Sequence, residues 1–146
     1  MKIKPNIHEN ILEVSIENRP GEIGICSKEI TKFLELRKTD PDTIYRFVLS
    51  IEEIVSNIIK YAYSDCDKHE IELVVEIMKD QVVISFTDDG FPFDPRNAPQ
   101  PDTNLEIEKQ PIGGLGIFLV KNMMTDILYK RLNGKNILKL SFGRFL

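Results

Sequence analysis

Two side chains that could act together on a ligand stand four residues apart in a segment with helical apolar periodicity. Glu53 and Asn57 would lie side by side on one face of that helix, and Lys60 and Tyr61 continue the same stripe. The spacing therefore places a carboxylate and an amide in one patch. It is equally typical of the solvent-exposed face of an amphipathic helix, so the pair does not define a site by itself.

A second candidate is Asp88-Asp89-Gly90, which ends the β-rich run Val82–Thr87. An acid at a strand terminus can accept a hydrogen bond from a ligand amine, and a glycine beside it allows a ligand to approach the backbone closely. Acids and glycine are also ordinary residues in a turn that leaves a strand.

A third candidate is Gly113-Gly114-Leu115-Gly116, which precedes an apolar helical segment. Backbone N–H groups at the positive end of a helix form a site for phosphate. The sequence is not a Walker A loop, because no Gly-Lys-Ser or Gly-Lys-Thr follows. It does not fit a Rossmann turn either, because a proline-rich loop precedes it instead of a strand. A flexible entry to the helix is the alternative interpretation.

The elements that must position these groups follow from periodicity and from turn residues. Asp40-Pro41-Asp42 combines an N-cap, a proline at the first helical position and an acid in the first turn, and so predicts a helix start. We predict strands at 11–16, 70–78, 81–87, 127–132 and 137–142, and helices at 22–37, 41–63 and 113–124. This order predicts an α+β fold, a two-layer sandwich with helices on one face of a mixed, mainly antiparallel sheet.

Residues 91–112 contain five of the eight prolines, at positions 92, 95, 99, 101 and 111. So much proline excludes a long regular element. Loops of this length are uncommon in compact domains and are usually lids or binding loops. We therefore expect a lid over residues 91–112, between the second and third candidate sites.

Composition limits the classes of protein. The 146 residues fit a single domain spanning 1–146. The net charge of −4 disfavours a nucleic-acid partner. No apolar run reaches the length of about 18 residues needed to span a bilayer, and no apolar segment follows the first lysines, so we expect a cytoplasmic protein without a membrane partner. His8 and His69 are expected at the surface, Arg96 is expected to be a free surface charge, and no metal-binding set of Cys and His residues is evident.

Taken together and in order, the three candidates resemble the Bergerat-fold ATPases of the gyrase and histidine kinase superfamily. Glu53–Asn57 is similar to their N-box, Asp88–Gly90 to their adenine box, and Gly113–Gly116 to their glycine-rich second box. The resemblance covers nearly the whole chain. Within the superfamily, three runs look most like the anti-sigma factor serine/threonine kinases: Glu53–Asn57 followed by Tyr61–Tyr63, the stretch Asp88–Pro95, and Gly113–Val120.

The resemblance implies a role for each matching residue. Asn57 would coordinate a Mg²⁺ that bridges the phosphates, and Glu53 would be the general base. Asp88 would accept a hydrogen bond from the adenine amine, and Gly90 would leave room for the ring. The remaining implied nucleotide-binding residues belong to the lid and the phosphate loop: Lys109, Gly113, Gly114, Leu115 and Gly116. Related ATPases often place a threonine near the adenine on the final strand, where this chain offers only Ser141 as a hydroxyl.

The implied function is that of a Mg-ATP-dependent protein serine/threonine kinase that acts as an anti-sigma factor. Its partners would be a sigma factor and an anti-sigma factor antagonist, which it would phosphorylate on a serine, and the resemblance also implies a homodimer. The alternative is an ATP-binding regulatory module that sequesters a partner with little or no kinase activity. Glu53 favours the kinase, because a pure binding module has no use for a base beside the metal ligand.

Overall fold

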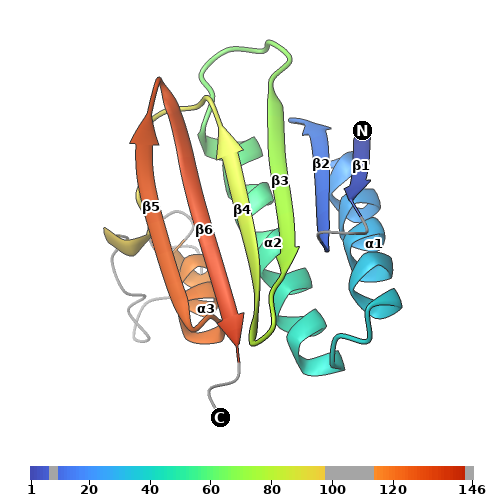
Figure 1. Ribbon diagram of the computed structural model, residues 1–146. Helices are drawn as coiled ribbons and strands as arrows, with labels where there is room; N and C mark the ends of the chain where they lie inside the picture. Colours follow the sequence, from blue (N-terminus) through green and yellow to red (C-terminus); the bar gives the residue numbers. More distant parts are fainter. Residues whose placement is uncertain (7–9, 98–113, 144–146) are drawn as a thin grey trace.

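The computed structural model describes residues 1–6, 10–97 and 114–143. Figure 1 shows the helices gathered on one face of a single sheet. The elements in chain order are β1 (Lys2–Asn6), β2 (Ile11–Glu17), α1 (Gly21–Leu36), α2 (Pro41–Tyr61), β3 (Glu70–Ile77), β4 (Gln81–Asp88), the 3₁₀ helix η2 (Pro95–Asn97), α3 (Gly114–Met123), β5 (Asp126–Leu132) and β6 (Lys135–Gly143). The predicted α+β class and two-layer arrangement are confirmed.

The sheet has the strand order β1-β2-β3-β4-β6-β5. Every strand pair between described residues is antiparallel, so the sheet contains none of the parallel pairing that a mixed sheet would have. The pairing of β4 with β6 matters most for the site, because its register places Asp88 opposite Asn136. Residues 48 positions apart in the sequence are thereby brought to one end of the sheet.

β1 was not expected from the sequence. Its segment, Lys-Ile-Lys-Pro-Asn, carries two lysines and a proline within five residues and so lacks the composition of a central strand. The structure places it at the edge of the sheet, paired only with β2. Edge strands tolerate proline and often carry lysine, because one side of their backbone has no strand partner.

The hydrophobic core lies between the sheet and the helices. Strands β2, β3 and β4 each bury alternate residues, as a sheet with one covered face requires. From α2, the side chains of Phe47, Ile51 and Val55 are fully buried against this face. These buried residues are four positions apart and mark the face of α2 that packs on the sheet. Glu53 and Asn57 lie at the boundary of the core, where both residues are half-buried.

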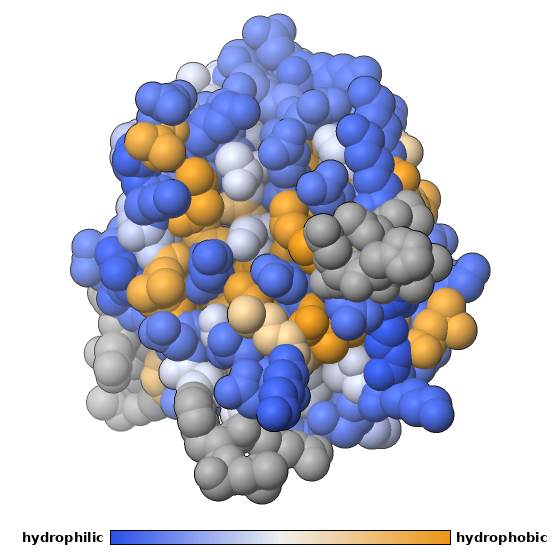
Figure 2. All heavy atoms as spheres, in the orientation of Figure 1, coloured by the Kyte–Doolittle hydropathy of each residue, from blue (hydrophilic) through white to orange (hydrophobic). Residues whose placement is uncertain are grey.

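The opposite face of the sheet looks toward the viewer in Figure 2. Hydrophilic side chains cover much of it, with hydrophobic groups scattered between them. Leu128 and Leu132 of β5 are among the exposed hydrophobic residues. Among the described helices, none is both long enough and apolar enough to cross a membrane.

The start of α2 has the predicted cap. Asp40 Oδ2 accepts a hydrogen bond from the backbone N–H of Thr43 at 3.2 Å, and Oδ1 accepts one from the Thr43 hydroxyl at 2.8 Å. Pro41 occupies the first helical position. These contacts satisfy one N–H group that the first turn would otherwise leave unpaired. They also fix the residue at which α2, the helix that carries Glu53 and Asn57, begins.

Replacing this cap should destabilise the fold measurably. We expect Asp40→Ala to lower the free energy of unfolding by about 1 kcal/mol, because the side-chain acceptor is lost, and Asp40→Asn to cost only a few tenths, because asparagine caps almost as well. Urea denaturation of the two variants and the wild type measures this. Equal destabilisation by both variants would contradict the capping role.

Candidate functional site

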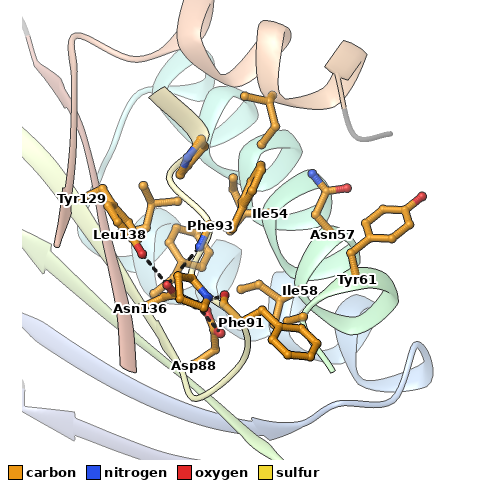
Figure 3. A pocket seen from close by; sticks show the side chains of 15 residues that line it. Ile54, Asn57, Ile58, Tyr61, Asp88, Phe91, Phe93, Tyr129, Asn136 and Leu138 are labelled. Atoms are coloured by element: carbon orange, nitrogen blue, oxygen red, sulfur yellow. Dashed lines mark hydrogen bonds between the residues drawn. The ribbon is translucent and has the colours of Figure 1, made fainter. Parts of the chain in front are cut away.

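A cavity of about 380 Å³ opens between α2, the end of β4, the segment after Gly90, β5, β6 and α3 (Figure 3). Its walls are mostly apolar, and the side chains that form them include Ile54, Ile58, Phe86, Ile117 and Leu138. The side chains with polar groups that line it are Asn57, Tyr61, Asp88, Tyr129 and Asn136. An apolar cavity of this size with a few polar groups is the usual form of a small-molecule site.

Asp88 is the buried carboxylate of this cavity, with 6% of its surface exposed. Its Oδ1 accepts hydrogen bonds from the Gly90 backbone N–H at 2.9 Å and from Asn136 Nδ2 at 3.0 Å. Its Oδ2 has no hydrogen-bond partner among the described residues. Burial raises the pKa of the Asp88 carboxyl, and the hydrogen bonds from Asn136 and Gly90 oppose that rise. One oxygen of the carboxylate is thus held by the protein, and the other can accept from a ligand.

Gly90 has a structural requirement of its own. A Cβ at this position would come 2.5 Å from Ala62 Cβ and 2.6 Å from the Ala62 carbonyl oxygen, both too close. The next residue, Phe91, donates its backbone N–H to that same carbonyl at 2.9 Å. The strand end therefore packs directly on the end of α2, which closes the cavity on this side.

Glu53 and Asn57 are one turn apart on α2 and face different neighbours. Asn57 lines the cavity. The carboxylate of Glu53 lies against Gly116 in the first turn of α3, where a Cβ on Gly116 would overlap Glu53 Oε2. The absence of a side chain at Gly116 thus lets a carboxylate of one helix reach the start of another. The described residues contain no group of three or more His, Cys, Asp or Glu that could form a metal site by themselves.

The other predicted nucleotide-binding residues are distributed as follows. Lys109 and Gly113 lie outside the described residues, as does most of the expected lid. Gly114 begins α3, and Leu115, the next residue, is exposed and does not line the cavity. The structure therefore places Asn57 and Asp88 on the wall of the cavity and Gly90 in the turn next to Asp88. Glu53 and Gly116 contact each other.

The sequence did not indicate Asn136 and Tyr129, which line the cavity, or Arg131, which binds the turn after β4. The Tyr129 hydroxyl donates to Asn136 Oδ1 at 2.5 Å, and Asn136 Nδ2 donates to the Phe91 carbonyl at 2.8 Å. Arg131 Nη1 donates to the Gly90 carbonyl at 2.7 Å. One sequence signal could have found Asn136: it alternates with Leu138 and Leu140, so it is a polar residue in the inward-facing phase of its strand.

Arg96 is not the free surface charge that was expected. Its guanidinium binds the Asp94 carboxylate through two nitrogens, with Nη2 2.7 Å from Oδ2 and Nε 3.0 Å from Oδ1. This hydrogen bonding lowers the pKa of Asp94. Lys121 Nζ also donates to the Arg96 carbonyl at 2.9 Å, which ties this turn to α3.

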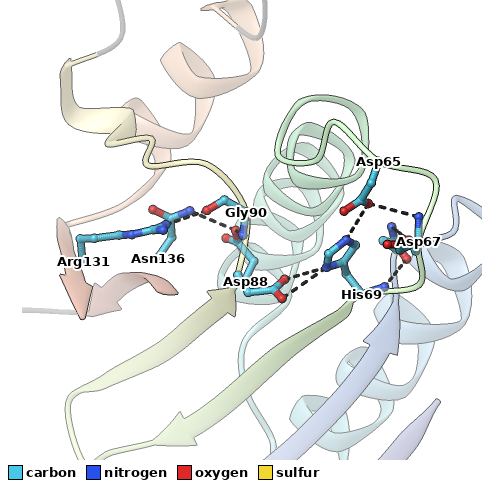
Figure 4. Close-up of polar contacts among 9 residues, drawn as sticks. Asp65, Asp67, His69, Asp88, Gly90, Arg131 and Asn136 are labelled. Atoms are coloured by element: carbon cyan, nitrogen blue, oxygen red, sulfur yellow. Dashed lines mark hydrogen bonds and ion pairs between the residues drawn. The ribbon is translucent and has the colours of Figure 1, made fainter. Parts of the chain in front are cut away.

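His69 is partly exposed, in keeping with the expected surface position, and it is held in a cluster of side chains (Figure 4). Its Nε2 lies 2.8 Å from Asp65 Oδ1, and its Nδ1 lies 3.1 Å from Asp89 Oδ1. The imidazole also stacks on Tyr63, with the ring centroids 4.0 Å apart. The hydrogen bond to Asp65 raises the pKa of His69, and the hydrogen bond and charge of Asp89 act in the same direction. Nothing in the sequence indicated this pairing, because Asp89 is 20 residues away.

This cluster should make stability depend on pH with a definite sign. A raised His69 pKa stabilises the fold fully below the ordinary value of about 6.5 and loses that contribution as pH rises through the raised pKa. Because the pKa of Asp65 is lowered, its contribution is lost only as pH falls below about 4. We expect the denaturation midpoints of wild type and His69→Gln to differ most near pH 5 to 6 and to converge at higher pH.

Asp65→Asn provides the matched comparison, since it removes the other member of the hydrogen bond. It should reduce the same pH dependence. A constant difference between wild type and His69→Gln from pH 5 to pH 9 would contradict the charged cluster.

Comparison with known proteins agrees with this geometry. Residues 16–142 match the family described as the histidine kinase-like ATPase domain. The serine-protein kinase RsbW of Bacillus cereus is 30% identical over 105 residues, which cover 69% of this chain and 65% of that protein. RsbW of Oceanobacillus iheyensis is 23% identical over 121 residues, covering 80% of this chain and 76% of the relative.

Two solved structures share the fold. The RsbU and RsbW domains of a Mycobacterium tuberculosis protein superimpose with a TM-score of 0.66 at 15% identity, covering 91% of this chain and 32% of that one. The catalytic domain of the histidine kinase ThkA superimposes with a TM-score of 0.50 at 14% identity, covering 89% and 97%.

The α+β sandwich agrees with this family match. The chain belongs to the histidine kinase-like ATPase family. It resembles the RsbW serine-protein kinases, and it spans 65% of the length of the Bacillus cereus relative.

Proposed function

We propose that this chain is a Mg-ATP-dependent protein serine/threonine kinase, formed by a single ATPase domain over 1–146 with a lid at 91–112. The observation that carries the proposal is the buried Asp88 carboxylate at the wall of the apolar cavity, with Oδ2 without a partner among the described residues. An adenine ring fits apolar walls, and its exocyclic amine supplies the donor that this oxygen lacks.

The phosphates would extend toward the start of α3. Gly114 and Gly116 lie in its first turn, where N–H groups have no partner within the helix and can donate to phosphate oxygens. Leu115 would contribute its backbone N–H in the same way. Its side chain is exposed and does not line the cavity. Gly113 and Lys109 remain predicted phosphate contacts from the preceding segment.

Asn57 fits the role of a Mg²⁺ ligand. It lines the cavity one turn from Glu53, and its amide oxygen is the type of ligand that Mg²⁺ prefers. Mg²⁺ in nucleotide sites takes few ligands from the protein and the rest from phosphates and water, so one amide is a sufficient contribution. When bound, the ion would neutralise the charge of the phosphates.

Glu53 would act as the general base. Its carboxylate lies one turn from Asn57 and against Gly116, between the proposed metal ligand and the proposed phosphate loop. It would take the proton of a serine hydroxyl as that oxygen forms a bond to the γ-phosphorus. The bond from phosphorus to the β–γ bridging oxygen then breaks, and ADP leaves.

The names of the relatives support a protein substrate. RsbW proteins are named serine-protein kinases. We therefore propose an anti-sigma factor in the cytoplasm that phosphorylates a serine on an anti-sigma factor antagonist, also binds a sigma factor, and forms a homodimer. The alternative, an ATP-binding module with little or no kinase activity, shares the cavity and Asp88 but needs neither Glu53 nor its contact with Gly116.

Substitution of the base separates these two functions. Glu53→Gln should bind ATP normally and lose phosphate transfer by about 10² to 10⁴-fold, the usual contribution of a positioned base. Transfer of labelled γ-phosphate to the anti-sigma factor antagonists of the same genome is the assay, with ATP binding measured by calorimetry. Asp88→Asn should instead lose about ten- to a hundredfold in ATP affinity.

Glu52→Gln is the matched control, because Glu52 is the exposed neighbour of Glu53 on the same helix. It should leave transfer unchanged. Full transfer by Glu53→Gln would remove the general-base role, and a wild-type protein that binds ATP but transfers nothing would favour the binding module.

The contact between Glu53 and Gly116 gives an independent prediction. Gly116→Ala should displace the Glu53 carboxylate, because the two would overlap, yet the far end of a glutamate can move without unfolding the protein. We expect transfer to fall about ten- to a hundredfold from misplacement of the base, with the free energy of unfolding changed by less than about 1 kcal/mol.

Gly24→Ala is the control for a glycine inside a helix. A Cβ on Gly24 meets nothing within 4 Å, so this variant should keep transfer and gain about 0.5 to 1 kcal/mol of stability. If Gly116→Ala lost ADP affinity and transfer by the same factor, the effect would belong to phosphate binding and the displacement of Glu53 would be ruled out as its cause.

A further inference from the structure

We propose that Asn136, oriented by Tyr129, is a positioning residue that makes the site selective for purines with a 6-amino group over purines with a 6-oxo group. It does so by binding one oxygen of Asp88 and leaving the other as an acceptor. This inference rests on the proposed ATP site and adds a determinant of its base specificity.

Two backbone groups fix the orientation of the Asn136 amide. The Phe93 N–H, which can only donate, lies 3.3 Å from Oδ1. The Phe91 carbonyl, which can only accept, lies 2.8 Å from Nδ2. The oxygen and nitrogen of the amide therefore cannot be exchanged, and the nitrogen must face Asp88.

The amide is fully used within the protein. Nδ2 donates to Asp88 Oδ1 and to the Phe91 carbonyl, while Oδ1 accepts from the Phe93 N–H and from the Tyr129 hydroxyl. An asparagine side chain offers two donors and about two acceptor positions, and all are occupied here. Asn136 therefore does not need to touch the base, and its effect must pass through Asp88.

The two oxygens of Asp88 therefore differ in their hydrogen bonding. Oδ1 already accepts from Asn136 and from the Gly90 N–H. Both are donors, so both favour the ionised carboxylate, which can only accept. Oδ2, which has no hydrogen-bond partner among the described residues, then remains a pure acceptor on a residue that lines the cavity.

A pure acceptor distinguishes bases at the 6-position. The amino group of adenine donates to it. The 6-oxo group of hypoxanthine or guanine would set oxygen against oxygen in a buried site and leave both groups unsatisfied. Sites built around such a polar contact reject the mismatched analogue much more strongly than apolar contacts do.

Asn136→Asp tests the inference with almost no change of shape. It keeps the oxygen that accepts from Tyr129 and Phe93, and it replaces the donor with an oxygen 3.0 Å from Asp88 Oδ1. Two carboxyl groups this close share a proton. The second carboxyl group disfavours ionisation of Asp88, and with Oδ1 still accepting from the Gly90 N–H the proton can lie on Oδ2. Oδ2 then donates to a 6-oxo group, and 6-oxo purines are no longer excluded.

The measurement is calorimetric binding of ADP and of inosine diphosphate, which differ in the 6-substituent and allow no phosphate transfer. Wild type should prefer ADP, and Asn136→Asp should reduce the ratio of the two affinities by about tenfold or more. Tyr129→Phe removes only the hydroxyl and should reduce the ratio by about two- to fivefold. If a thermal unfolding control shows that Asn136→Asp does not fold, Tyr129→Phe provides the test instead.

Asn122→Asp is the matched control. The Asn122 amide donates to the Phe118 carbonyl at 2.8 Å on the exposed side of α3, away from the cavity. The ratio of its affinities for ADP and inosine diphosphate should equal that of wild type.

The ratio separates positioning from a merely structural role, because general damage to the pocket weakens both nucleotides equally. Equal weakening by the folded variant, or an unchanged ratio, overturns the role of Asn136 while the ATP site stands. A wild type that binds neither nucleotide overturns the proposed ATP site and this inference with it.

Discussion

A carboxylate buried at the end of a strand must be hydrogen-bonded, and the arrangement of this site depends on how that requirement is met for Asp88. The antiparallel register of β4 and β6 brings Asn136 opposite Asp88, and the chain immediately after β4 folds back to supply the Gly90 N–H. The same amide binds the Phe91 carbonyl and the Phe93 N–H. One set of hydrogen bonds thus holds the carboxylate, the turn after it and the wall of the cavity.

The two site glycines illustrate two different constraints. At Gly90 a side chain would strike Ala62, including its backbone carbonyl, so the packing of β4 on α2 depends on that glycine. At Gly116 a side chain would strike only the mobile end of Glu53. The first constraint concerns the fold, and the second concerns where a carboxylate sits. Glycine therefore permits close packing of the backbone at one position and close approach of a carboxylate at the other.

Several charged side chains near the cavity, among the described residues, bind partners within the protein. Arg96 is held by Asp94, Arg131 by the Gly90 carbonyl, and His69 by Asp65 and Asp89. These contacts fix the turns that border the cavity. The fold is shared with solved proteins at only about 15% identity.

The sequence by itself determined the elements with strong local signals, such as α2 with its cap and proline and the strands β3 and β4. It also placed Glu53 and Asn57 one turn apart, because helical spacing is local. It missed β1, whose lysines and proline are permitted only by an edge position. It also missed Asn136, Tyr129 and the partners of His69. Tertiary structure decided these, because strand order and register join residues 20 to 48 positions apart, and local propensity carries no information about such pairs.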